Sequence, residues 1–162
     1  MNKLKRYVLA GTTFVIIIGI VSHFVYELSG NNFWVGFFFP VSESTLEHMK
    51  LCFFPMLLYA LFMNKKLKAD YPCVTSGLLA GILTGTFLIP VIFYTYSGAL
   101  GKNFLFLDIL TFILSIVLAF AVVYRLTLCC KMKPFTALLK LLVLIVGICF
   151  LLFTYLPPDF LL

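Results

Sequence analysis

The sequence predicts an all-α polytopic membrane protein, with five transmembrane helices in a single domain that covers residues 1–162. Of these residues 63% are hydrophobic and 11% are charged, and the mean hydropathy is +1.13. A soluble domain is about 45–50% apolar and about 25% charged, so this chain has too few polar groups to cover a water-exposed surface. Apolar runs of about 20 residues, the length that crosses a bilayer, recur five times. Little chain remains for a soluble catalytic domain.

The five runs are each expected to form one helix. The first, residues 7–26, has no signal-peptide cleavage site, so we interpret it as a retained anchor. The second and third are residues 46–63 and 74–96, and the fourth and fifth are residues 104–124 and 135–155. Each run is continuously apolar and longer than a barrel strand, which favours helices over strands.

Basic residues predict how these helices are oriented. Nine of the twelve fall before the first run, between the second and third, or between the fourth and fifth: Lys3, Lys5, Arg6, Lys65, Lys66, Lys68, Arg125, Lys131 and Lys133. The excess of Lys and Arg on cytoplasmic loops therefore predicts a cytoplasmic N-terminus and an outside C-terminus, in the cell membrane. The net charge of +6 indicates contact with the lipid bilayer and its anionic headgroups, and no nucleic acid partner.

The cysteines do not indicate a disulfide framework. Cys73, Cys129 and Cys130 fall near the predicted reducing side, and the other two lie inside spans. We expect the adjacent pair Cys129 and Cys130 to be small juxtamembrane hydrophobes.

Three glycines in the third span predict a helix–helix contact. Gly77, Gly81 and Gly85 follow one another at four-residue intervals, so they share a face on which a neighbouring backbone can approach closely. The neighbour is expected to belong to the same chain, although a second copy would fit the same pattern.

The remaining polar residues gather at the predicted outer ends of four spans. The pair Ser44 and Glu47 forms a capping box that starts the second helix. The residues concerned are His23 and Glu27 of the first span, Glu43, Glu47, His48 and Lys50 around the start of the second, Tyr94 near the end of the third, and Asp108 about one turn inside the fourth. Charged groups inside a span cost about 2.5–3.5 kcal/mol at its centre, so such a cluster needs a function or a structural partner.

The residue types favour a metal site. His23, Glu27, Glu47, His48 and Asp108 are suitable ligands for a divalent ion, zinc as the first choice. Glu43 is then expected as general base, with Lys50 or Tyr94 as a partner for an oxyanion. This hypothesis describes a metal-dependent membrane hydrolase that acts on a small molecule or a lipid at the outer leaflet.

Two other hypotheses explain the same cluster. The carboxylates and His23 could change protonation in a proton- or ion-coupled carrier, although the fourth and fifth spans offer few polar groups below Asp108. In a non-enzymatic accessory or scaffold protein, Glu47 would pair with Lys50 and Asp108 with Lys50 or His48. The cluster would then only specify how the helices pack.

Residues 40–50, PVSESTLEHMK, resemble the signature of an uncharacterised family of small bacterial multi-spanning membrane proteins. That signature reads Ser-Pro-Val-Asn-Glu-Ser, two residues, Glu-His, one residue, Lys. This chain has Phe39 for Ser, Ser42 for Asn, and Leu46 where Trp is common. The resemblance extends to further polar and glycine positions: His23, Tyr26, Glu27, Tyr94, Tyr96, Gly98 and Asp108. It implies a bacterial cytoplasmic membrane and which residues matter, but no activity.

Overall fold

The computed structural model describes residues 2–156 and is all-helical over that range. Five long helices are apolar enough to cross a membrane, as predicted. In chain order the elements are α1 (Lys3–Leu28), the short α2 (Phe33–Gly36), α3 (Thr45–Leu67), α4 (Val74–Leu100), α5 (Leu105–Cys129), the 3-10 helix η1 (Lys133–Phe135) and α6 (Thr136–Phe153). The helices extend beyond most of the predicted bounds, because charged residues such as Lys3 and Lys65 continue the helical turns past the apolar runs.

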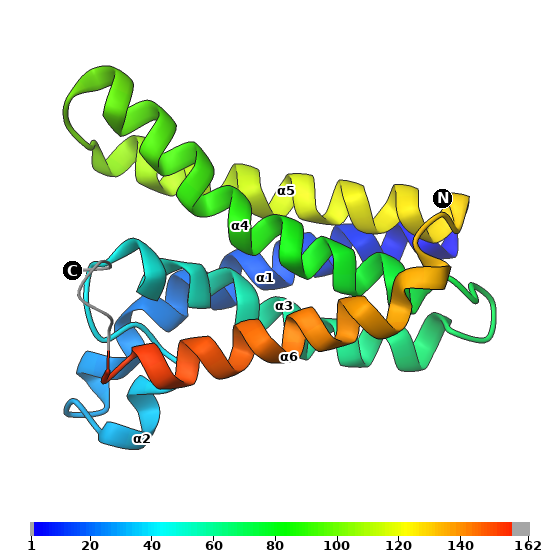
Figure 1. Ribbon diagram of the computed structural model, residues 1–162, viewed down its shortest axis with the longest axis horizontal. Helices are drawn as coiled ribbons and strands as arrows, with labels where there is room; N and C mark the ends of the chain where they lie inside the picture. The colour runs from blue at the N-terminus through cyan, green and yellow to red at the C-terminus, as the bar shows by residue number, and fades with distance from the viewer. Residues whose placement is uncertain (1, 157–162) are drawn as a thin grey trace.

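The long helices run up and down in a bundle (Figure 1). Helix α3 lies between α1 and α4, α5 packs against α4 and α1, and α6 lies against α4 and α3 from outside. The central position of α3 explains why it carries the largest fully buried side chains, Lys50 and Phe53 among them. Its Tyr59 also donates a hydrogen bond to the carbonyl of Tyr7 on α1 (2.7 Å).

The glycine stripe of α4 contacts α5 of the same chain, as expected. A Cβ atom on Gly77 would lie 2.6 Å from Thr127 Oγ1, and one on Gly85 would lie 2.8 Å from the Cβ of Ala119. These distances are too short for real Cβ contacts, so only glycine lets the two backbones come this close.

At the other end of the hairpin, α4 and α5 leave the bundle. No residue from position 90 to position 110 is buried, whereas Ile89 before this stretch and Thr111 after it both are. Figure 1 shows the hairpin turning away from α1 and α3 at this end. Pro90 lies where α4 departs, and proline inside a helix removes a backbone hydrogen bond and favours a bend. The hairpin and the rest of the bundle thus diverge, and a cavity occupies the wedge-shaped space between them.

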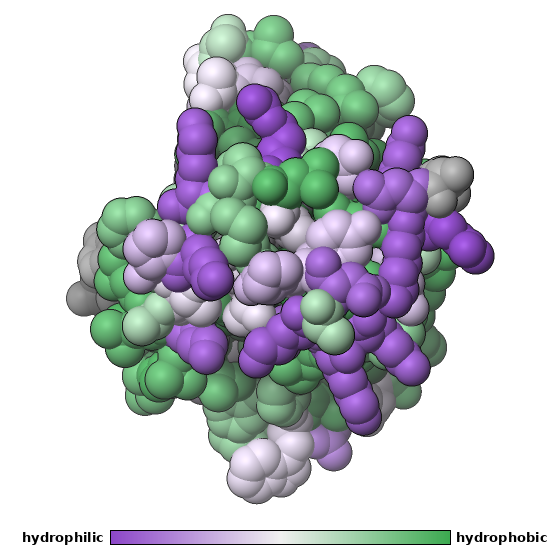
Figure 2. Space-filling model, turned by 90° about the vertical axis from the view of Figure 1, so that its right-hand side faces the viewer, coloured by the Kyte–Doolittle hydropathy of each residue, from purple (hydrophilic) through white to green (hydrophobic). Residues whose placement is uncertain are grey.

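The two ends of the bundle differ in charge. The start of α1, the loop from α3 to α4, and the connection from α5 to α6 meet at one end, which we call the basic end. Figure 2 looks at this end and shows long hydrophilic side chains gathered around it. Lys3 forms an ion pair here with Asp70. The predicted orientation would place this end in the cytoplasm; the C-terminus itself lies outside the described residues.

The expectation of unpaired thiols near the basic end was wrong for two cysteines. Cys73 and Cys130 form a disulfide, with their Cα atoms 5.3 Å apart and a sequence separation of 57. Cys73 caps the start of α4 and Cys130 the end of α5, and the glycine stripe holds these two ends together. The expectation was based on the redox state of the compartment predicted for this end, which does not indicate whether two cysteines lie close together.

The disulfide predicts how many cysteines react with an alkylating reagent. Cys52, Cys129 and Cys149 are free. Protein denatured without reductant is expected to gain three labels by intact mass, and five after reduction. Replacing Cys130 with serine should expose Cys73 and give four labels under both conditions. Five labels on the unreduced wild-type chain would contradict the bond.

Candidate functional site

The polar end opposite the basic end brings three predicted site residues together. His23 lies near the end of α1, Glu43 precedes α3, and His48 lies in the first turns of α3. One oxygen of Glu43, Oε2, lies 3.6 Å from Nε2 of His23 and 3.4 Å from Nε2 of His48. Ligand atoms of all three residues lie within 4.8 Å of one another. We call this group the His/Glu/His site.

The local sequence of α3 orients His48. Ser44 caps the helix, because its side chain accepts from the backbone N–H of Glu47 (3.3 Å). The carbonyl of Ser44 lies 2.9 Å from Nδ1 of His48. A carbonyl only accepts hydrogen bonds, so Nδ1 carries a proton in this contact and Nε2 is the ring nitrogen left for another partner. Histidines that bind metals are commonly held in this way, by a carbonyl or carboxylate on the second nitrogen.

Glu47 and Lys50 lie elsewhere and form a buried pair. The Lys50 ammonium is fully buried and donates to Glu47 Oε2 (2.8 Å), the Gly36 carbonyl (3.2 Å) and Thr154 Oγ1 (2.5 Å). Three donors therefore meet three acceptors. Glu47 Oε2 also accepts from the N–H of Val41 (2.9 Å). This geometry is the Glu47–Lys50 pair of the scaffold hypothesis, and it leaves neither residue free to face a ligand at the His/Glu/His site.

Asp108 lies beside the His/Glu/His site without joining it. Its carboxylate accepts a hydrogen bond from Tyr96 across the α4–α5 hairpin, so the pairing predicted with Lys50 or His48 was wrong. Because residues two apart on a helix point in nearly opposite directions, Tyr94 faces away, with 63% of its surface exposed. Glu27 is also exposed, and we find no ion pair for it among residues 2–156.

A cavity of about 690 Å³ adjoins the His/Glu/His site. This volume lies within the range of about 300–1,000 Å³ typical of ligand pockets. The wall comes from α1, the start of α3, the end of α4 and the start of α5, and its polar members are His23, Glu43, Thr45, His48, Asn103, Asp108 and Thr111. The cavity occupies the wedge below the departing hairpin. It thus joins two histidines and two carboxylates to a mostly apolar chamber.

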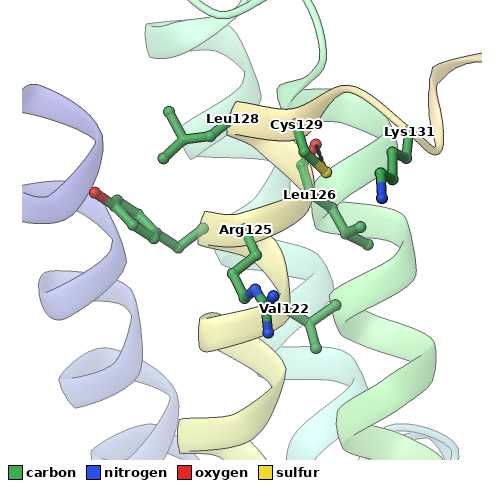
Figure 3. A pocket seen from close by; sticks show the side chains of 7 residues that line it. Val122, Arg125, Leu126, Leu128, Cys129 and Lys131 are labelled. Atoms are coloured by element: carbon green, nitrogen blue, oxygen red, sulfur yellow. Dashed lines mark hydrogen bonds between the residues drawn. The ribbon is translucent and has the colours of Figure 1, made fainter.

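A second hollow lies along the last turns of α5 at the basic end (Figure 3). Arg125 and Lys131 flank it, and Cys129 contributes a thiol that bonds the carbonyl of Leu126. Its lining contains no histidine or carboxylate. A metal would meet only one suitable ligand and two cations there, so the His/Glu/His site is the better candidate.

The sequence analysis expected these residues at one end of the bundle, and the structure brings three of them together there. Glu43 was expected as a base, and its carboxylate lies between the two histidines. Thr154 and the Gly36 carbonyl were not anticipated as partners of Lys50, since nothing in the sequence relates Lys50 to positions 104 and 14 residues away.

Comparisons with known proteins place the chain in a family but give no activity. A family model described as "Family of unknown function (DUF6512)" matches residues 1–162. Neither the curated proteins nor the solved structures contain a match.

Proposed function

We propose that this multi-pass membrane protein binds a divalent metal ion, with zinc as the first choice, through His23, Glu43 and His48. The chain belongs over its whole length to the DUF6512 family of unknown function. The observation that carries the proposal is the orientation of His48. Its Nδ1 is committed to the Ser44 carbonyl, and its free Nε2 faces the carboxylate that also faces His23.

The spacing of the ligand atoms supports a small ion. Zinc binds imidazole nitrogen and carboxylate oxygen at about 2.0–2.2 Å, so tetrahedral ligands lie about 3.3–3.5 Å apart. The two His–Glu distances of 3.4 and 3.6 Å are close to this separation. Two histidines and one carboxylate are also the ligand set of several catalytic zinc sites, which keep the fourth position open for water.

The adjoining cavity supports a catalytic use of such an ion. A metal with an open position supplies a water whose pKa falls to about 7, and so a nucleophile at neutral pH. Asp108 lines the same cavity and is the carboxylate that remains to accept a proton. We therefore propose hydrolysis of a ligand held in the cavity. With the orientation that the basic residues predict, the reaction takes place at the outer face of a bacterial cell membrane.

Elemental analysis of detergent-purified protein tests the metal site. After incubation with zinc and gel filtration, the wild-type chain is expected to retain about one zinc ion. His23→Ala and His48→Ala should each retain less than a tenth of that, because a site with two ligands left holds the ion poorly. Glu27→Gln is the matched control: Glu27 lies one turn from His23 but outside the cavity lining, so zinc content should not change.

Equal helix content by circular dichroism would show that the variants are folded. A wild-type chain without zinc, or folded histidine variants that keep it, would contradict the proposal.

A further inference from the structure

The cavity beside the His/Glu/His site is open along its side, toward the surface that a bilayer would surround. Its side walls are the end of α1 and the start of α5, which touch where Phe112 packs against Gly19. Residues that line it also present large outward surfaces: Ile20 is 46% exposed, Ile109 48%, and Leu105 76%. These helices are membrane spans, so the exposed surfaces face acyl chains.

The polar and apolar parts of the cavity lie at different depths. His23 is five residues from the end of α1, about 8 Å along the helix, which is near the level of lipid headgroups. Gly19 lies one turn deeper and marks the apolar floor together with Leu51 and Ile89. A molecule in this cavity would thus have its polar part at the His/Glu/His site and its apolar part along the groove between α1 and α5.

The charged side chains of the cavity also limit which molecules can bind in it. Glu43 and Asp108 bring two negative charges to the cavity, which a divalent cation would balance. The polar part of the occupant would then meet a site without net charge, in which an oxygen atom can join the water as a fifth ligand of the metal.

We propose that the substrate is a membrane amphiphile: an acyl chain that occupies the groove between α1 and α5, joined to a head group that offers an oxygen ligand to the metal. This inference rests on the metal site proposed above and adds the class of substrate and its path, which is lateral, from the lipid. The wedge below the α4–α5 hairpin is the opening through which the chain would pass.

Two hydroxamic acids with the same metal-binding head test this inference. The protein, in phosphatidylcholine nanodiscs, is loaded with cobalt, whose visible spectrum reports its ligands, and titrated with acetohydroxamic acid or dodecanohydroxamic acid. Two variants, Ile20→Trp and Ile109→Trp, narrow the groove from either wall. The matched control is Leu118→Trp, which changes α5 at a position that is 40% exposed and does not line the cavity.

Both groove variants are expected to raise the half-saturating concentration of dodecanohydroxamic acid at least tenfold, and that of acetohydroxamic acid less than twofold. Leu118→Trp should change neither value. Partitioning of the long probe into the lipid affects every variant equally and cancels in the comparison. An unchanged value for the long probe in both groove variants, or an equal loss of both probes, would overturn the proposed substrate class.

The cobalt spectrum separates the two proposals. If the wild-type chain shows no bound cobalt, the metal site is wrong and the amphiphile proposal falls with it. If cobalt binds and the groove variants have no selective effect on the long probe, only the substrate class is wrong.

Discussion

Replacing Lys50 with methionine is expected to lower the free energy of unfolding by about 3–5 kcal/mol, the usual cost of removing one partner from a buried ion pair. The methionine would leave Glu47, only 3% exposed, without its cation in a low-dielectric interior. The carbonyl of Gly36 would lose its donor as well. Unfolding by sodium dodecyl sulfate in mixed micelles, followed by circular dichroism, measures the change.

A double variant distinguishes the lost charge balance from lost packing. Glu47→Gln with Lys50→Met removes both charges and keeps an oxygen that accepts from the N–H of Val41, so it should be more stable than Lys50→Met alone. Lys102→Met is the matched control, since Lys102 is exposed at the same end, and should stay within about 0.5 kcal/mol of the wild type. A Lys50→Met variant as stable as the control would refute the structural role of the pair.

Lys50→Met should also weaken metal binding, although it leaves the three proposed metal ligands unchanged. The Lys50–Glu47 pair holds the Gly36 carbonyl and the N–H of Val41, and these lie at either end of the segment that leads to Glu43. Releasing this segment would let the Glu43 carboxylate move away from the two histidines. We therefore expect the buried pair to affect the His/Glu/His site through this segment.

Replacing Gly81 with leucine is expected to destabilise the bundle by about 3 kcal/mol, the upper end of the usual cost of overpacking. A Cβ atom at this position would lie 3.0 Å from the Ala119 carbonyl and still closer to Val123, and backbone cannot yield as a side chain can. The two helices would have to separate along the whole stripe. The same unfolding titration measures the loss.

Gly98 provides the control on the same helix. A Cβ there would meet nothing within 4 Å, so Gly98→Ala should be neutral or raise the stability by up to about 1 kcal/mol through the better helix propensity of alanine. Equal stability of Gly81→Leu and Gly98→Ala would contradict the close contact between α4 and α5.

The five spans were predictable because each is a continuous apolar run, and such a run indicates a membrane-spanning helix however the helices pack. Depth was predictable too, since helix direction and length place His23, Glu43 and His48 at one end. The rotation of each helix about its own axis could not be predicted. Glu47 and His48 were both assigned to the metal, but neighbouring residues on a helix point about 100° apart. In the structure His48 turns toward α1, and Glu47 points to Lys50, which also donates to Thr154 directly after α6.

Contacts between residues far apart in the sequence could not be predicted for a related reason. Cys73 and Cys130 approach only because glycines spaced along α4 bring α5 close at that end. The departure of the hairpin from the bundle could not be predicted from hydropathy either, because large apolar side chains such as Val91 and Leu105 are exposed on it. Pro90 inside the third predicted span favours a bend and allows a cavity beside it, and Ile89 and Phe93 do line one.

The disulfide also changes the covalent topology of the hairpin. The chain from Cys73 to Cys130 is a closed ring, with the bond at one end and the turn at Gly101 at the other. A protease that cuts this turn would open the ring without producing two separable pieces. The nicked protein would migrate as a single chain on a gel until a reductant was added. The splayed tip of the hairpin can thus be severed while both helices stay joined at the basic end.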